Sequence, residues 1–182
     1  MPIDAQAFKI GMRRLAAGVC LITTEDADGA RSGMTATAVC SVSADPQTLL
    51  CCINRQNSSY AMIRRTGAFA VNVLALDDRP LADQFGRPVP SSEKFGLGLW
   101  LRLETRAPVL ESALVGFDCR VSQAVEVGTH GIIFGEVLAI HARAVAAKPL
   151  LYAHGAYGGF ASVGAASDPE SLWIPTWDHE PH

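Results

Sequence analysis

The sequence predicts a mainly β fold: a closed or nearly closed antiparallel barrel, with helices at its periphery. Short β-rich runs recur along the chain, turns between them contain glycine, and long helical patterns are few. Regular strands with glycine-rich turns are typical of antiparallel barrels. A length of 182 residues suits one ordinary domain, and no internal repeat marks a second.

Composition excludes several classes of protein. The net charge is −3, with both signs spread along the chain, so neither nucleic acid nor a membrane surface is an expected partner. No run approaches the roughly 20 apolar residues of a membrane span, and the N-terminus lacks the pattern of a signal peptide. The five cysteines form no C-x-x-C pair and no zinc-ligand spacing. We therefore expect reduced thiols, no metal and a cytoplasmic protein.

The first part of the chain reads as a helix followed by a hairpin. Asp4 can cap a helix whose apolar positions share one face, and Gly18 ends this pattern. A strand is expected at 19–24, a hairpin turn at 25–29 and the partner strand at 30–36.

Residues 31–59 organise the rest of the chain. Small and hydroxylic residues fill 33–38, a polar corner follows at 41–46, and 48–53 have the apolar character of a buried strand. Residues 54–59 form a polar loop that opens the next helix.

Beyond this stretch, helices and strands alternate. A helix is expected at 58–66, a strand at 69–74 and a second helix at 78–85. The polar loop that follows, 86–94, is long enough to indicate a function rather than a simple connection.

The last expected strands are the longest. Short apolar pieces at 97–103 and 108–110 precede two runs at 114–127 and 132–144, which the glycine-containing segment 128–131 joins. Two β-rich runs connected by so short a segment predict an antiparallel hairpin.

The stretch 31–59 also carries the first indication of function. Small residues at 33–38 would let a planar ligand lie against the backbone, whose N–H groups can then reach it. Asn57, Ser58 and Ser59 lie where a helix begins, and the free N–H groups there favour an anion such as a phosphate. A flat ring held at one end and a phosphate held at the other indicate a flavin site.

Other kinds of active site are not expected. The chain shows no Ser-His-Asp arrangement and no close pair of carboxylates. It also has no G-x-G-x-x-G motif after a strand; the nearest approach, Gly96-Leu97-Gly98, lacks the third glycine. A nicotinamide dinucleotide would therefore not be held by a Rossmann domain.

These residues resemble the signature of the flavin reductase-like family, the small reductase components of two-component flavin-dependent monooxygenases. The likeness continues at 69–74, 128–137 and 149–152, and it covers about residues 5–160. Several motifs in the family's order are far more specific than one short pattern.

The resemblance implies an FMN-binding split β-barrel over residues 1–164, with 165–182 as a C-terminal tail. It also implies a homodimer with flavin near the interface. The implied activity is hydride transfer from NADH or NADPH to FMN or FAD, which supplies reduced flavin to a separate oxygenase by diffusion or transient contact. Two alternatives stay open on the same fold: a flavin-binding electron carrier and a pyridoxamine-phosphate-oxidase-like protein.

The resemblance further implies a set of cofactor-binding residues. The backbone of 35–38 would line the flavin ring, and the polar loop that follows the next strand would hold the ribityl chain and phosphate. The full set is Met34, Thr35, Ala36, Thr37, Ala38, Ser41, Ser43, Asn54, Arg55, Ser58, Ser59, Phe85, Lys94, His130 and Tyr157.

Several of these residues have a structural alternative that the sequence leaves open. Ser41 and Ser43 can bond flavin polar atoms or simply turn the chain. Ser58 and Ser59 match the phosphate-binding loop, and they can also cap a helix. Phe85 can stack on the dinucleotide or fill the core from its helix.

The same holds for the remaining polar and aromatic positions. Asn54 matches a position at the ribityl side of the flavin, or it caps a loop. Arg55 adds charge near the phosphate, or it is solvated. Lys94 matches a less regular part of the family pattern, and Tyr157 would close the site although extra glycines surround it.

His130 is the most informative single residue. It lies between Gly128 and Gly131, a context poorly suited to a packed core histidine. It matches the family histidine beside the nicotinamide and flavin rings. An imidazole there can orient the dinucleotide or hold a proton near the developing charge, so we expect His130 to be catalytic.

Overall fold

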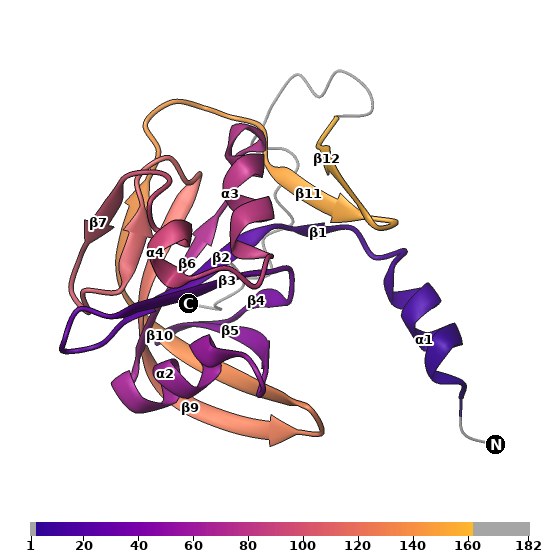
Figure 1. The fold of residues 1–182 in the computed structure, drawn as a ribbon, viewed down its shortest axis with the longest axis horizontal. Helices are drawn as coiled ribbons and strands as arrows, with labels where there is room; N and C mark the ends of the chain where they lie inside the picture. Colours follow the sequence, from indigo (N-terminus) through magenta and orange to yellow (C-terminus); the bar gives the residue numbers. More distant parts are fainter. Residues whose placement is uncertain (1–2, 162–182) are drawn as a thin grey trace, which may run out of the picture.

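The computed structural model describes residues 3–161 and confirms a mainly β architecture with peripheral helices (Figure 1). The expected C-terminal tail, residues 165–182, lies outside the described residues. The helices are short: α1 (Ala5–Met12), α2 (Ser58–Thr66), the 3-10 helix η1 (Leu76–Asp78), α3 (Arg79–Phe85) and α4 (Ser91–Lys94).

Within residues 3–161, the strands form three antiparallel sheets. A seven-stranded sheet has the order β3-β2-β6-β9-β10-β5-β4, a three-stranded sheet the order β1-β11-β12, and β7 pairs with β8. The bounds are β1 (Ala17–Gly18), β2 (Cys20–Glu25), β3 (Arg31–Ala36), β4 (Val39–Ala44), β5 (Gln47–Asn54), β6 (Ala68–Val73), β7 (Trp100–Arg102), β8 (Pro108–Leu110), β9 (Val115–Val127), β10 (His130–Ala142), β11 (Leu150–Ala153) and β12 (Ala156–Gly159).

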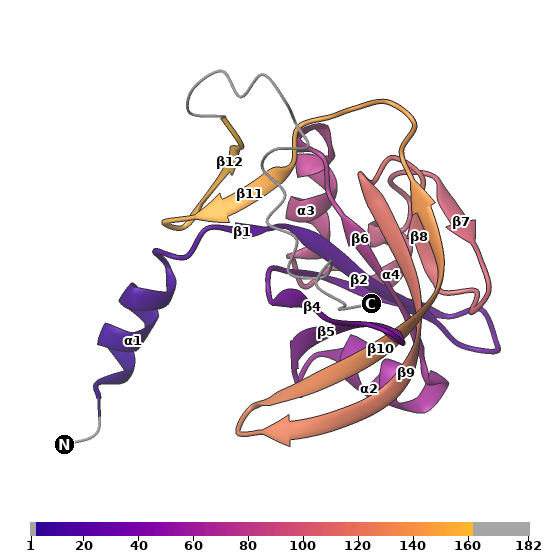
Figure 2. The same ribbon diagram turned by 180° about the vertical axis from the view of Figure 1, so that it is seen from behind.

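The large sheet curls back on itself. Its two edge strands, β3 and β4, are consecutive in the chain, and only Thr37 and Ala38 separate them. So short a link requires both edges of the sheet to lie close together. The result is a barrel wall with β9 and β10 as its longest members, seen from both sides in Figures 1 and 2.

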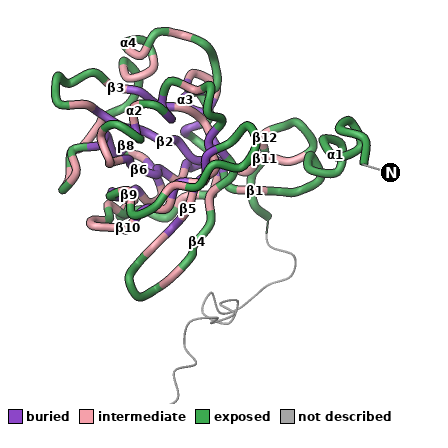
Figure 3. The backbone as a smooth tube through the Cα atoms, turned by 90° about the horizontal axis from the view of Figure 1, so that it is seen from below, coloured by how far each residue is buried: buried purple, intermediate pink, exposed green. Residues whose placement is uncertain are grey.

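Two apolar clusters lie on the two faces of the central strands. Inside the barrel, Ile22 packs with residues that include Ile53 and Phe69. On the other face, Leu21 packs with side chains of α3, β8 and β11. Successive side chains of a strand point to opposite faces, so β2 is buried at every position and is apolar at its start. Figure 3 shows the burial concentrated in these central strands.

Asn72 is a polar residue inside this core, and its partners explain its position in β6. Its side-chain nitrogen donates to Leu21 O at 3.2 Å and to Thr23 Oγ1 at 3.1 Å. Its side-chain oxygen accepts from Leu110 N at 2.7 Å. The amide therefore joins β8 to the barrel, and its buried polar atoms are satisfied.

Some expected boundaries were wrong at the start of the chain. The first helix ends at Met12 rather than Gly18, because Ala17 and Gly18 pair with β11. The polar corner expected at 41–46 is instead mostly strand β4, followed by a tight turn at Asp45-Pro46. The end of the first helix depends on a strand partner that is distant in sequence, and β4 contains polar residues because it is an edge strand. Neither feature gives a local periodic signal.

Further differences lie in the second half. The expected loop 86–94 contains the one-turn helix α4, and β10 begins at His130 rather than at residue 132. Helix α4 is attached to β3 by side chains: Ser91 donates to the Arg31 carbonyl, and Lys94 Nζ donates to Gly33 O at 3.0 Å. Such a short helix depends on these tertiary contacts rather than on its own periodicity.

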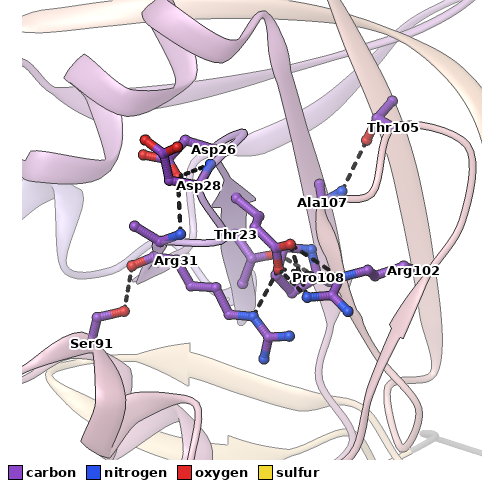
Figure 4. Close-up of polar contacts among 11 residues, drawn as sticks. Thr23, Asp26, Asp28, Arg31, Ser91, Arg102, Thr105, Ala107 and Pro108 are labelled. Atoms are coloured by element: carbon purple, nitrogen blue, oxygen red, sulfur yellow. Dashed lines mark hydrogen bonds and ion pairs between the residues drawn. The ribbon is translucent and has the colours of Figure 1, made fainter.

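A buried ion network joins β2, β3 and β7. The Glu25 side chain is only 3% exposed, and its carboxylate accepts from Arg31 Nε at 2.8 Å and from Arg102 Nη2 at 2.8 Å. Figure 4 shows the Arg31 and Arg102 side chains reaching into this network, with Ser91 on the Arg31 carbonyl. Burial raises the pKa of Glu25, but the hydrogen bonds and charges of Arg102 and Arg31 outweigh it and lower the pKa overall.

We predict that this network stabilises the fold only while Glu25 is ionised. Because its folded-state pKa is below the unfolded value, its contribution is present above about pH 4.5 and is lost as the pH falls through the folded-state pKa. Glu25→Gln should lower the free energy of unfolding at pH 7 by about 1.5–3 kcal/mol, the range for hydrogen bonds to charged groups. Urea denaturation at pH 7 and at pH 3–4 measures both effects.

Glu104→Gln is the matched control, because Glu104 is exposed. The control should unfold like the wild-type chain at both pH values. Equal losses from the two substitutions at pH 7 would contradict a special role for Glu25. A free energy of unfolding that depends on pH in Glu25→Gln as it does in the wild-type chain would contradict that role as well.

Candidate functional site

The link between β3 and β4 presents small residues to solvent. Thr37 and Ala38 are exposed, while Ala36 before them is buried. The Ala38 carbonyl accepts from Cys52 N at 3.0 Å, so the link runs alongside β5 just before Asn54. Small exposed residues leave the backbone open to a flat ligand.

The start of α2 lies beside β3. Its N-cap is Asn57, whose side chain accepts from Ser59 N at 2.9 Å, so neither serine is the cap. Ser59 is fully buried and its Oγ lies 2.9 Å from Ser32 Oγ, whereas Ser58 is exposed. The two serines thus differ in exposure: Ser58 is exposed, with its Oγ 3.4 Å from Ser32 Oγ, and it lies where helix N–H groups favour an anion.

His130 is the first residue of β10 and is exposed. The turn before it is Gly128-Thr129, and the positive φ of 56° at Gly128 favours glycine. In the barrel, His130 is the register partner of Asn54 on β5. Directly opposed residues of antiparallel strands have Cβ atoms about 4.5–5.5 Å apart. Two predicted site residues far apart in sequence therefore lie side by side.

Among the residues that the structure describes, the His130 ring has one hydrogen-bond partner. Its Nδ1 lies 2.9 Å from Thr129 Oγ1, which fixes the direction of the imidazole relative to the turn. The donor in this pair depends on the tautomer of the ring. The outer imidazole nitrogen is thereby directed away from Thr129.

A hollow of about 720 Å³ lies between α2 and the β9–β10 turn. It is bordered by Asn54 and Thr129, the neighbours of His130 in space and in sequence. The sequence alone does not predict Glu126, Arg64 and Tyr60 as members of this region, because Tyr60 has the pattern of an apolar helix position and Glu126 that of a strand residue. The lining residues are Asn54, Arg55, Gln56, Tyr60, Ala61, Arg64, Glu126, Gly128 and Thr129.

Phe85 and Lys94 lie under β3. Phe85 is 2% exposed, packs edge-on against Phe95 with ring centres 5.1 Å apart, and lies against Gly33. Lys94 Nζ donates to the carbonyls of Gly33 at 3.0 Å and Phe85 at 3.3 Å, and burial lowers its pKa. Both residues therefore support the strand that leads to Thr35, whose Oγ1 donates to Ala82 O at 2.7 Å.

Three predicted residues lie away from His130 and Asn54. Ser43 Oγ donates to Asp45 O at 2.9 Å and accepts from Asp45 N, which is the chain-turning alternative. Ser41 lines an apolar hollow of about 280 Å³ with β4, β9 and β10 residues. Tyr157 packs on Tyr152 in the small sheet, and β12 lies at the opposite end of the molecule from the β9–β10 turn (Figures 1 and 2).

Two other kinds of feature are absent from the described residues. Between residues 3 and 161, no group of three or more His, Cys, Asp or Glu side chains could hold a metal ion. Within the same part of the chain, none of the helices combines the length and apolar character that crossing a membrane requires.

Comparison with known proteins identifies the family that has this arrangement. The model of the flavin reductase like domain matches residues 12–161. The chain is 46% identical over 157 residues to the "FMN reductase (NADH) RutF" of Methylorubrum populi, covering 86% of this chain and 77% of that protein. It is 44% identical to the protein of that name from Stutzerimonas stutzeri, with 78% and 81% covered.

Solved structures give the same result. A putative flavin reductase of Haemophilus somnus superposes with a TM-score of 0.83 at 34% identity, covering 87% of this chain and all of that one. BorF, described as the flavin reductase component of a bacterial two-component tryptophan halogenase, superposes with a TM-score of 0.79 at 26% identity, covering 88% of this chain and all of that one.

Proposed function

Because this chain belongs to the flavin reductase-like family, we propose that it is an NADH-dependent flavin reductase whose flavin is FMN. The observation that carries the proposal is 46% identity over most of the chain to a relative named for this activity. Membership in this family also disfavours the pyridoxamine-phosphate-oxidase-like alternative. NADPH and FAD are the competing cofactors in the experiment below.

The residues on the barrel fit the two ligands. Small exposed residues at Thr37-Ala38 can lie against a flavin ring, and exposed Ser58 at the start of α2 can hold its phosphate. Asn54 and His130 occupy neighbouring positions, where the ribityl chain of the flavin and the nicotinamide of the dinucleotide would meet. When bound, the flavin supplies the redox chemistry by accepting hydride from the nicotinamide.

The protein's own part is positioning and charge stabilisation. Hydride transfer tolerates little misplacement of the two rings, so fixed side chains at the ring edges matter more than a nucleophile. His130 contributes an imidazole nitrogen that can donate a hydrogen bond or a proton toward the developing negative charge.

The proposed reaction sequence continues in another protein. BorF is described as one component of a two-component halogenase, and its barrel resembles this one. We infer that this chain likewise supplies reduced flavin to a separate oxygenase, by diffusion or transient contact. The free cysteines of the described chain support a reducing, cytoplasmic location.

A homodimer is part of the same proposal. Helix α1 has no buried residue and extends from the barrel, exposed along its length (Figure 3). Three apolar residues on this helix or just after it are strongly exposed: Phe8 is 57% exposed, Met12 49% and Leu15 61%. An isolated helix of eight residues is not stable in water, so a second copy covering this apolar face accounts for its formation.

Of the three predictions that this proposal makes, the first tests the activity itself. NADH oxidation by the purified chain should rise in proportion to added free FMN, because the flavin accepts the hydride. Steady-state kinetics with NADH or NADPH and FMN or FAD should give the highest kcat/KM for NADH with FMN. An electron carrier would instead show no stimulation by free flavin, and that result would overturn the proposal.

The second prediction concerns the phosphate. Ser58→Ala should weaken FMN binding about 10- to 100-fold, because a hydrogen bond to a charged group contributes about 1.5–3 kcal/mol. Riboflavin, which lacks the phosphate, should bind the variant as it binds the wild type. Ser59→Ala is the control: its hydroxyl is buried against Ser32, so stability should fall and both flavins should be affected alike. Equal losses of both ligands in Ser58→Ala would remove Ser58 from the site.

The third prediction concerns assembly. Analytical ultracentrifugation at micromolar concentration should give the mass of two chains. Phe8→Lys combined with Leu15→Lys should shift the equilibrium toward the monomer, because a charge on each apolar position opposes burial. Lys9→Ala on the same helix should leave the dimer intact. A wild-type monomer with full activity would exclude the homodimer.

A further inference from the structure

The β9–β10 turn needs support from outside its own hairpin. Residues 125–130 are all exposed, and among the described strands β5 pairs with this end of the hairpin on the β10 side, while β6 pairs with β9 only as far as Arg120. Figure 2 shows the two long strands extending past the rest of the sheet. His130 lies at this end, so its position depends on whatever holds the turn.

The Tyr60 ring is the first support. The residue is 7% exposed, although α2 is a surface helix. A Cβ on Gly131 would lie 2.2 Å from Tyr60 Cε2, so only glycine at this position lets the ring lie this close to β10. Gly131 follows His130 directly. The ring therefore fixes the backbone beside the histidine.

The Tyr60 hydroxyl is the second support. It donates to Glu126 Oε1 at 3.0 Å, and Glu126 is the register partner of Gly131 across the hairpin. The pKa of Tyr60 is raised, first by burial and then by this carboxylate, so the phenol keeps its proton at neutral pH. One side chain of α2 thus contacts both strands of the ribbon next to the turn.

Arg55 completes the arrangement from the other side. Its Nη2 lies 3.0 Å from Glu126 Oε2, and its Nη1 donates to Gly128 O at 3.3 Å. Its main-chain nitrogen donates to Thr129 O at 3.0 Å. Arg55 follows Asn54 directly, so these contacts tie the turn to the strand end that faces His130.

We propose that Tyr60, Glu126 and Arg55 form a positioning clamp, which acts on hydride transfer by holding His130 in place beside Asn54. The clamp fixes the turn, and the contact between Thr129 and His130 then orients the imidazole. This inference rests on the proposed reductase function. It assigns a kinetic role to three residues that need not touch either ligand.

The exposure of the ion pair favours positioning over stability. The Arg55 and Glu126 side chains are 45% and 51% exposed, and ion pairs so exposed to solvent contribute little to folding. A substitution at Glu126 should therefore fold, which makes its kinetic effect measurable. Tyr60→Phe keeps the ring on Gly131 and removes only the hydroxyl.

The test is a double-mutant cycle with His130→Ala. Tyr60→Phe and Glu126→Ala should each lower kcat/KM for NADH about three- to tenfold, a size typical of coupled neighbours, while the dissociation constant for FMN and the melting temperature change little. In the His130→Ala background the same substitutions should have no further effect. Glu111→Gln, at an exposed position outside the hollow, is the control and should behave as wild type.

Each other outcome has a distinct meaning. If the clamp substitutions reduce kcat/KM by the same factor with and without His130, they do not act through the histidine, and the proposal is overturned. A loss of FMN affinity or of melting temperature that accounts for the rate change also overturns it. A wild-type chain without NADH-dependent flavin reduction would refute the proposed function itself, and the clamp with it.

Discussion

The two-residue link between β3 and β4 is the constraint on which the site depends. Because consecutive strands form the two edges of the large sheet, the sheet has to curl until those edges lie close together. The link also continues the ladder between β4 and β5, in which Val39 pairs with Cys51, so that Ala38 lies alongside β5, and β5 is paired with β10. The small-residue link, Asn54 and His130 therefore meet at neighbouring strands, although Ala38 and His130 are 92 positions apart in sequence.

Glycines let the aromatic rings pack directly on the wall of the barrel. A Cβ at Gly33 would lie 2.6 Å from the Phe85 ring, and one at Gly135 would lie 2.5 Å from Phe69. Gly131 and Tyr60 repeat the arrangement next to His130. In each case a flat side chain replaces the missing Cβ, which allows closer packing than two branched residues would. Helices α2 and α3 are thereby fixed against the strands that carry the site.

Local patterns in the sequence were sufficient to predict the mainly β fold, helix α2, the first hairpin and the long β9–β10 pair. They could not predict β1 or α4, because pairing with β11 and contacts with β3 stabilise these elements. The site shows the same division. His130 stood out by its glycine neighbours, whereas Glu126 is recognised only through the fold that brings Tyr60 and Arg55 to it.

Glu25 and Glu126 have similar partners but differ in burial, and this difference decides how much each contributes to the stability of the fold. The Glu25 carboxylate accepts hydrogen bonds from two arginines, and its side chain is 3% exposed. Removing these partners would leave an uncompensated charge buried in the core. Glu126 accepts from one arginine and one tyrosine with its side chain 51% exposed, where water can replace a lost partner. The first network joins the small β7–β8 sheet to the barrel. In the clamp that we propose, the second network need not be strong, because its role is to set where a solvent-exposed imidazole lies rather than whether the barrel forms.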